Sequence, residues 1–118
     1  MSDVVEYPRE AIALALAQAR SGQRAGPQKT YVYRLDTSFT NNRYGAGHGI
    51  DLPLLLGDEA SWQGALLLGS SAWPEVHASG HRLRAAWAAF ARTGYPNTPG
   101  GCQFKPFSRF NPSPVVLK

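Results

Sequence analysis

The order of apolar and polar residues along the chain predicts a helix near its start, one clear strand after it, and an amphipathic helix in its second half. Pro8 precedes an Ala- and Leu-rich stretch over Arg9–Arg20, and this stretch is typical of a helix because proline fits the first helical turn. Ser21–Gln28 holds two glycines and a proline and is expected to be a loop. Thr30–Leu35 is dense in β-branched and aromatic residues, which predicts a strand.

Shorter elements are expected in the rest of the chain. Residues 36–49 are rich in Thr, Ser, Asn and Gly and favour a loop, whereas the apolar run Ile50–Leu56 predicts a short helix or turn. The pattern leaves Leu66–Trp73 unassigned, and Val115–Leu117 is compatible with one short terminal strand. An amphipathic helix ending at Gly94 is predicted from apolar positions that recur at steps of four and three: Val76, Gly80, Leu83, Trp87 and Phe90.

One clear strand among several helices cannot form a sheet by itself. A strand of the Thr30–Leu35 type, flanked by helices, resembles one βα portion of a parallel sheet whose neighbouring strands lie elsewhere. The pattern therefore predicts the α/β class. Residues 1–118 are expected to contribute a strand and its flanking helices to a larger sheet, and to be incomplete as an isolated domain.

Composition and charge narrow the function classes. The hydrophobic fraction of 43% with 17% charged residues predicts a folded chain. The net charge is +4, but the arginines are scattered among acidic and apolar residues, which argues against a nucleic-acid partner. Cys102 is the single cysteine, so no internal disulfide is expected and reducing, cytoplasmic surroundings are favoured. No stretch has the pattern of a signal peptide or the length of a membrane-spanning helix, so we expect a soluble protein without membrane partners.

His48 is the residue with the greatest chemical interest. It lies in Gly45-Ala46-Gly47-His48-Gly49, where the backbone is free to bend and the imidazole can project without competing side chains. From the residues alone, two interpretations stay open: an acid-base catalyst, or a turn histidine that hydrogen-bonds locally.

Three motifs favour the catalytic interpretation. In order along the chain, they are Tyr31-Val32-Tyr33-Arg34, then Gly45-Ala46-Gly47-His48-Gly49-Ile50-Asp51-Leu52-Pro53 followed by Gly57, and then Trp87-Ala88-Ala89-Phe90-Ala91-Arg92-Thr93-Gly94 with Pro96-Asn97. Their order and spacing resemble the C-terminal third of type B carboxylesterases, the α/β-hydrolase family that includes para-nitrobenzyl esterases and cholinesterases. The resemblance covers nearly the whole chain and implies a partial α/β-hydrolase fold.

The resemblance implies that His48 is the general base of a Ser-His-acid triad that hydrolyses small-molecule carboxylic esters without a cofactor. Triad members of this fold follow the order serine, acid, histidine, with the serine in a Gly-x-Ser-x-Gly elbow. That pentapeptide is absent here, since Gly69-Ser70-Ser71-Ala72 and Ser79-Gly80 both depart from it. The oxyanion-hole glycine cluster is also absent. We therefore expect these residues to be inactive without a serine and an acid supplied from elsewhere.

Some residues depart from the family pattern. Asp51 stands where glutamate is usual, Tyr95 replaces a common aspartate, and Phe104-Lys105-Pro106-Phe107 replaces the usual Trp-Pro-x-Tyr. Asp51 is too close to His48 in sequence to serve as the triad acid, which in the family lies far upstream. These departures concern loop packing more than the assignment of His48.

Other candidates carry weaker signals. His77 and His81 share a metal-ligand spacing, but no third ligand or suitably placed glutamate accompanies them. Cys102 has no nearby histidine that would activate it as a nucleophile. Trp62, Trp73 and Trp87 fit core or interface packing better than a ligand cage.

The other function that remains open is a non-catalytic interaction module, or a truncated or split-gene esterase segment. An exposed strand edge favours association with an N-terminal esterase segment or with a second copy of the chain.

Overall fold

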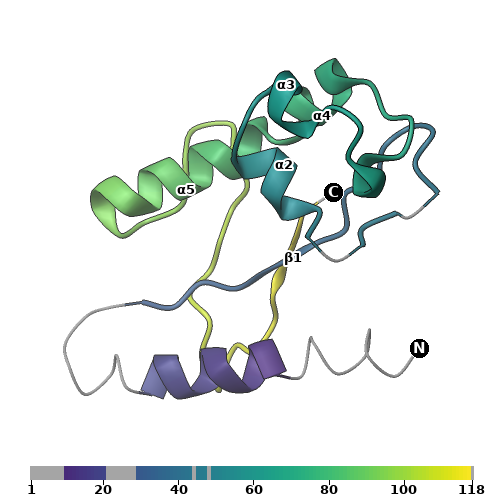
Figure 1. Ribbon diagram of the computed structural model, residues 1–118. Coiled ribbons are helices and arrows are strands. Elements are labelled where there is room, and N and C mark those ends of the chain that lie inside the picture. Colours follow the sequence, from purple (N-terminus) through teal and green to yellow (C-terminus); the bar gives the residue numbers. More distant parts are fainter. Residues whose placement is uncertain (1–9, 21–28, 44, 48, 118) are drawn as a thin grey trace. The chain divides into compact units, whose positions relative to one another are not determined.

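The computed structural model describes residues 10–20, 29–43, 45–47 and 49–117, shown by position along the chain in Figure 1. Residues 10–20 are helical, as predicted, and the expected loop at Ser21–Gln28 lies outside the described residues. The later elements are β1 (Tyr33–Leu35), α2 (Asp51–Leu55), α3 (Glu59–Trp62), the 3-10 helix η1 (Leu66–Leu68), α4 (Trp73–Ser79), α5 (His81–Thr93) and β2 (Val115–Leu117). Two compact units result: Met1–Tyr33 with Phe104–Val115, and Arg34–Gln103 with Val116–Lys118.

The first unit packs its phenylalanines against an extended segment. Phe104 and Phe107 are buried, and the rings of Tyr33 and Phe104 meet edge to face with their centroids 6.4 Å apart. The Phe107 N–H also donates to the Thr30 carbonyl at 2.7 Å. These contacts fix the Phe104-Lys105-Pro106-Phe107 stretch against the chain that leads into β1.

β1 and β2 pair as a two-stranded parallel sheet. In the first unit, Val115 donates to the Val32 carbonyl at 3.0 Å, and in the second, Asp36 donates to the Leu117 carbonyl at 2.7 Å. The terminal strand is thus confirmed, but the strand predicted over Thr30–Leu35 is reduced to three residues. Pairing cannot extend backwards from Val115, because the preceding prolines, Pro112 and Pro114, lack a backbone donor.

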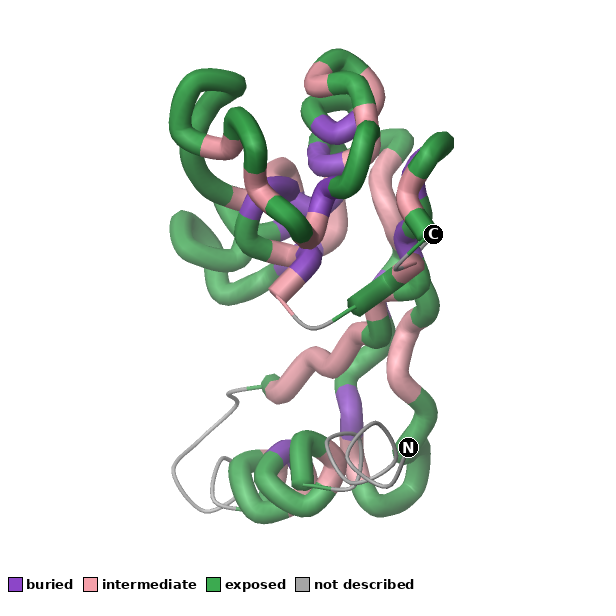
Figure 2. The backbone as a smooth tube through the Cα atoms, turned by 45° about the vertical axis from the view of Figure 1, so that its right-hand side comes forward, coloured by how far each residue is buried: buried purple, intermediate pink, exposed green. Residues whose placement is uncertain are grey.

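The second unit is built on a short helix packed against a helical corner: α2 contacts both α4 and α5, which also contact each other. Leu54 of α2 and Val76 of α4 are completely buried, and Figure 2 shows buried segments interleaved with exposed ones along these helices. Full burial of one such aliphatic side chain is worth about 1.5–3 kcal/mol. The predicted short helix within Ile50–Leu56 is therefore confirmed as α2, and its core-facing side chain explains why it forms there.

The single amphipathic helix predicted through Gly80 is wrong in two respects. The chain forms two helices, α4 and α5, that meet at Gly80, and Trp87 and Phe90 are 52% and 45% exposed. The buried face of α5 is formed by Leu83, Ala86 and Ala89. The change of direction at Gly80 rotates α5 relative to α4, so one periodic pattern does not describe both helices. The predicted stop at Gly94 is confirmed, because Gly94 closes α5 in the left-handed conformation.

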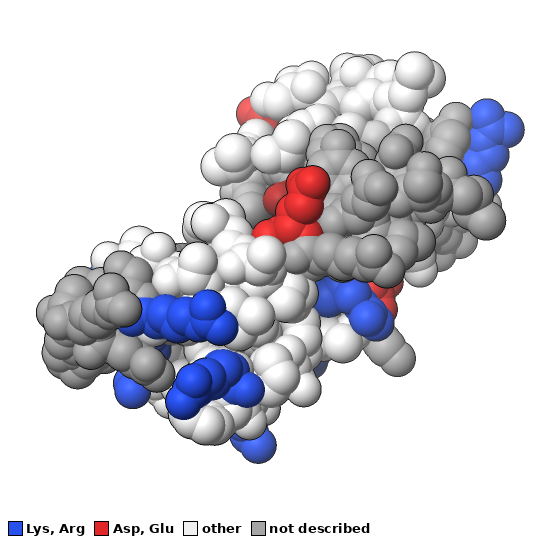
Figure 3. All heavy atoms as spheres, turned by 90° about the horizontal axis from the view of Figure 1, so that it is seen from below, with Lys and Arg blue, Asp and Glu red and all other residues white. Residues whose placement is uncertain are grey.

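Charged side chains form separate groups on the surface. On the face shown in Figure 3, acidic, uncharged and undescribed residues lie among the Lys and Arg side chains. The Leu66–Trp73 stretch, which had no clear pattern, contains η1 and a following loop.

In the part of the chain that the structure describes, no helix has both the length and the apolar character needed to cross a membrane.

Candidate active-site loop

His48 and Tyr44 lie outside the described residues, whereas the glycines around His48 are described. Gly45 and Gly49 have φ angles of +59° and +82°, a backbone region that favours glycine. A Cβ atom at either position would meet nothing within 4 Å, so the backbone conformation and not lack of space calls for glycine there. The predicted loop over residues 36–49 is confirmed for its described members.

On its C-terminal side the loop leads directly into α2. The Ile50 N–H donates to the Gly47 carbonyl at 3.2 Å, and the Leu52 N–H donates to the Gly49 carbonyl at 3.1 Å. Ile50 is buried, and Asp51 is the first residue of α2, where a carboxylate suits the positive end of a helix. Two turn hydrogen bonds and one buried side chain thus fix the chain immediately after His48.

Arg84 of α5 holds the far end of α2. Its Nη1 donates to the Leu54 carbonyl at 2.9 Å, and its Nη2 donates to the His77 carbonyl at 2.8 Å. Carbonyls in the last turn of a helix lack partners within that helix, so one guanidinium caps both α2 and α4. Gly80 is buried beside this contact, and a Cβ atom there would collide with Arg84 Nη1 and the Leu54 carbonyl. The helical corner can approach α2 this closely because residue 80 has no side chain.

On the N-terminal side a turn at residues 39–42 holds the chain. Phe39 is buried, the Asn42 N–H donates to the Phe39 carbonyl at 3.2 Å, and Asn41 has a φ of +62°, which asparagine tolerates better than most residues. The Asn42 side chain donates from Nδ2 to the Leu67 carbonyl at 2.9 Å. This turn is therefore tied to a segment 25 residues further along the chain.

Glu75 makes a second long-range contact to the same turn. Its Oε1 atom accepts a hydrogen bond from the Thr40 N–H at 2.8 Å, and the Ser71 hydroxyl donates to the Thr40 carbonyl at 3.4 Å. Glu75 lies in the first turn of α4, the helix that packs against α2. Both flanks of the histidine loop are thus connected to the α4–α5 corner. Sequence reasoning missed Glu75 and Arg84, because their partners are 35 and 30 residues away.

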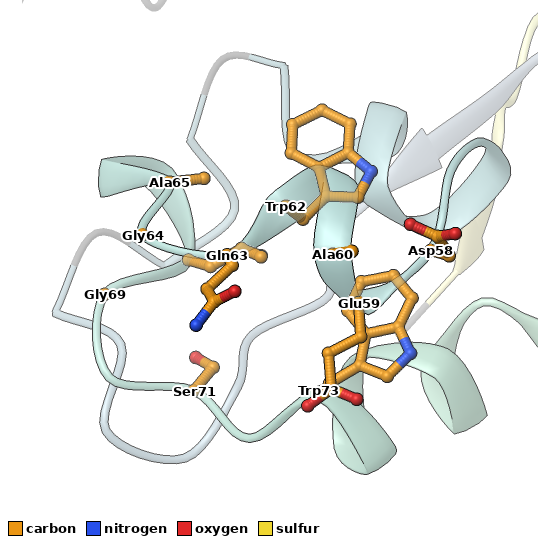
Figure 4. Close-up of a pocket in the computed structure, with 11 residues that line it drawn as sticks. Asp58, Glu59, Ala60, Trp62, Gln63, Gly64, Ala65, Gly69, Ser71 and Trp73 are labelled. Carbon is orange, nitrogen blue, oxygen red and sulfur yellow. The ribbon is translucent and has the colours of Figure 1, made fainter.

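A solvent-open hollow of about 560 Å³ lies beside α3 and the loop that follows η1. Figure 4 shows Trp62 and Trp73 among its walls, with Gln63 and Ser71 directed toward each other. Its polar lining side chains, including Asp58 and Glu59, are exposed or half-buried, and the hollow is open to solvent. We assign no catalytic role to this hollow.

The two other histidines lie in different helices. His77 is in the last turn of α4, where its ring lies 6.3 Å from that of Trp73, and His81 is the first residue of α5. Among residues 10–20, 29–43, 45–47 and 49–117, no group of three His, Cys, Asp or Glu side chains is arranged to hold a metal ion. Cys102 is a free cysteine of intermediate burial.

Comparison with known proteins relates the chain to a hydrolase. It is 36% identical over 78 residues to a probable N-octanoylanthranilate hydrolase of Rhodococcus erythropolis. The matched segment covers 66% of this chain and 17% of that protein, so the chain spans less than a fifth of the relative's length. No family model matches the chain, and no solved structure matches it.

Proposed function

We propose that this chain is the C-terminal part of a serine carboxylesterase of the type B family, in which His48 is the acid-base catalyst. The observation that carries the proposal is the similarity to a hydrolase over two thirds of the chain. The catalytic role of His48 is implied separately, by the resemblance of the three motifs described above to the type B family. The fold proposed is the corresponding part of an α/β-hydrolase, with β1 and β2 as two strands of its parallel sheet.

The geometry of the loop supports this proposal. A general base must present one ring nitrogen to the nucleophile and the other to an acid, which demands a fixed backbone on both sides. After His48, Ile50 is buried and Arg84 donates to the Leu54 carbonyl of α2. Before His48, the Thr40 N–H donates to Glu75. Such a loop on a helical scaffold is a suitable support for a catalytic histidine.

His48 would take the proton of a serine hydroxyl as it attacks the carbonyl carbon, then return it to the leaving group. The serine and the acid come from a part of the enzyme outside these 118 residues. The relative's name refers to an N-acyl compound, and an acyl-enzyme mechanism serves both ester and amide bonds. The acyl group transferred is therefore a better guide to the substrate than the bond cleaved.

The test replaces the matching segment of the Rhodococcus hydrolase with the sequence of this chain. Turnover of a nitrophenyl ester and of N-octanoylanthranilate is measured, together with labelling by a fluorophosphonate that reacts with activated serines. We expect an active chimera in which His48→Ala lowers kcat by at least about a thousandfold, because a triad acts as a unit. The chain's other histidines provide matched controls, His77→Ala and His81→Ala.

Two results would contradict the proposal. One is a His48→Ala chimera that is as active as the His81→Ala chimera. The other is esterase activity of the isolated 118-residue chain that depends on His48, because these residues would then contain a nucleophile of their own.

A second proposal concerns association. Several large apolar side chains are strongly exposed, including Leu14 in the first unit and Leu56 and Leu66 in the second, at 72%, 64% and 84%. We expect a complementary esterase segment, or a second copy of the chain, to cover such surfaces. Sedimentation of the isolated chain as a monomer at all concentrations, with no binding to the remainder of the hydrolase, would argue against both.

A further inference from the structure

We propose that Glu75 is a positioning residue that holds the histidine loop in its catalytic geometry. This inference rests on the proposed function of His48, and it assigns to Glu75 a role beyond the known contacts of the triad. Its basis is the 2.8 Å hydrogen bond from the Thr40 N–H to Glu75 Oε1, which joins the N-terminal flank of the loop to α4.

Glu75 differs from the other groups that hold this turn because it brings a charge. The Asn42 side chain and the Ser71 hydroxyl are neutral, and the Ser71 contact is long at 3.4 Å. A hydrogen bond to an ionised carboxylate is shorter and stronger than one between neutral groups. Of the hydrogen bonds that join the turn at residues 39–42 to later segments, the one from the Thr40 N–H is therefore the strongest.

The helix that carries Glu75 is itself firmly placed. Val76, the next residue, is completely buried, and the His77 carbonyl accepts from Arg84, which also caps α2. Glu75 thus ties the chain before His48 to the same helical pair that holds the chain after it. A displacement of α4 would move both flanks together, whereas loss of the Glu75 carboxylate would release only the N-terminal flank.

This difference predicts a specific kinetic effect. Release of one flank widens the range of imidazole positions without altering the groups that bind substrate, so kcat should fall while KM changes little. In the chimera, we expect Glu75→Ala to lower kcat by roughly tenfold or more, since displacement by about 1 Å can cost a hundredfold. Glu75→Gln keeps an uncharged acceptor of the same length, so its kcat should lie between those of Glu75→Ala and the unmodified chimera.

Glu59→Ala is the matched control. Glu59 lies in the first turn of α3, is exposed, and makes no hydrogen bond or ion pair with the residues the structure describes. The same variants are studied in the 118-residue chain by amide hydrogen exchange. Glu75→Ala should accelerate exchange at Thr40 and at the described glycines next to His48, whereas Glu59→Ala should not.

The outcomes separate the two proposals. An active chimera in which Glu75→Ala and Glu59→Ala have equal kcat values overturns the role of Glu75 and leaves His48 unaffected. An inactive chimera counts against the proposed function, and hydrogen exchange in the 118-residue chain then tests the role of Glu75. If Glu75→Ala and Glu59→Ala show equal exchange, the role of Glu75 is overturned. If Glu75→Ala fails to fold, kcat and exchange of Glu75→Asp, whose shorter side chain withdraws the acceptor, decide in the same way.

Discussion

Replacing Arg84 with methionine should destabilise the second unit by about 2 kcal/mol. The guanidinium makes one part-buried hydrogen bond to the Leu54 carbonyl and one exposed hydrogen bond to the His77 carbonyl. Hydrogen bonds from charged donors contribute about 1.5–3 kcal/mol, and solvent screening reduces the exposed one to about 0.5 kcal/mol. Methionine keeps most of the apolar stem, so the difference reports mainly on the two lost caps.

Urea unfolding followed by far-UV circular dichroism and by tryptophan fluorescence measures this difference. For a chain of this length, about 2 kcal/mol corresponds to a fall in Tm of about 8 °C. Arg82→Met is the control, because Arg82 is exposed on the same helix and has no hydrogen bond or ion pair with described residues. Arg84→Lys should lie between the two, since an ammonium lacks the fork that reaches both carbonyls. Equal midpoints for Arg84→Met and Arg82→Met would refute the capping argument.

Two further predictions concern pH and the sheet. The hydroxyl and the backbone N–H of Ser61 donate to the Asp58 carboxylate and lower the pKa of Asp58. The stability that these hydrogen bonds contribute is therefore complete above the ordinary aspartate pKa of about 3.9. It is lost as the pH falls through the lower pKa of the folded state. Asp58→Asn should therefore be less stable than the unmodified chain at neutral pH and equally stable in acid; a pH-independent difference in urea midpoint would be evidence against this linkage. In β2, Leu117→Ala should cost about 2–3 kcal/mol and Val116→Ala less than 1 kcal/mol, because Leu117 is buried and Val116 is 43% exposed. Urea midpoints compare the two, and a larger effect at Val116 would mean that the sheet faces the other way.

Local patterns predicted those elements whose causes lie within a few residues. The helix over residues 10–20, α2, the stop at Gly94 and the terminal strand all follow from propensity, apolar runs and a left-handed glycine. The glycine-rich loop around His48 was also readable, because its members favour turns over regular structure.

Contacts between distant segments explain what the sequence could not show. Gly80 fits the spacing of a continuous helix, yet the close approach of the Leu54 carbonyl makes it the corner between α4 and α5. The shift of the buried face to Ala86 and Ala89 follows from that corner and leaves Trp87 exposed. Tertiary contacts of this kind override local periodicity.

The same limit applies to the candidate site. Glu75 has the appearance of an ordinary acidic residue in the first turn of a helix, and Arg84 that of a solvated arginine. Their roles depend on backbone groups of Thr40 and Leu54, and backbone groups carry no sequence signature.

The pairing of β1 with β2 has a consequence for the order of events during synthesis. The hydrogen-bonding partners of β1 lie beyond the whole of residues 36–114, so translation must continue for on the order of ten seconds before they emerge. The contacts among α2, α4 and α5 span shorter stretches of sequence and can form during that interval. Until then β1 lacks the partner that β2 provides, so this pairing forms only after the helices between the two strands have been synthesised.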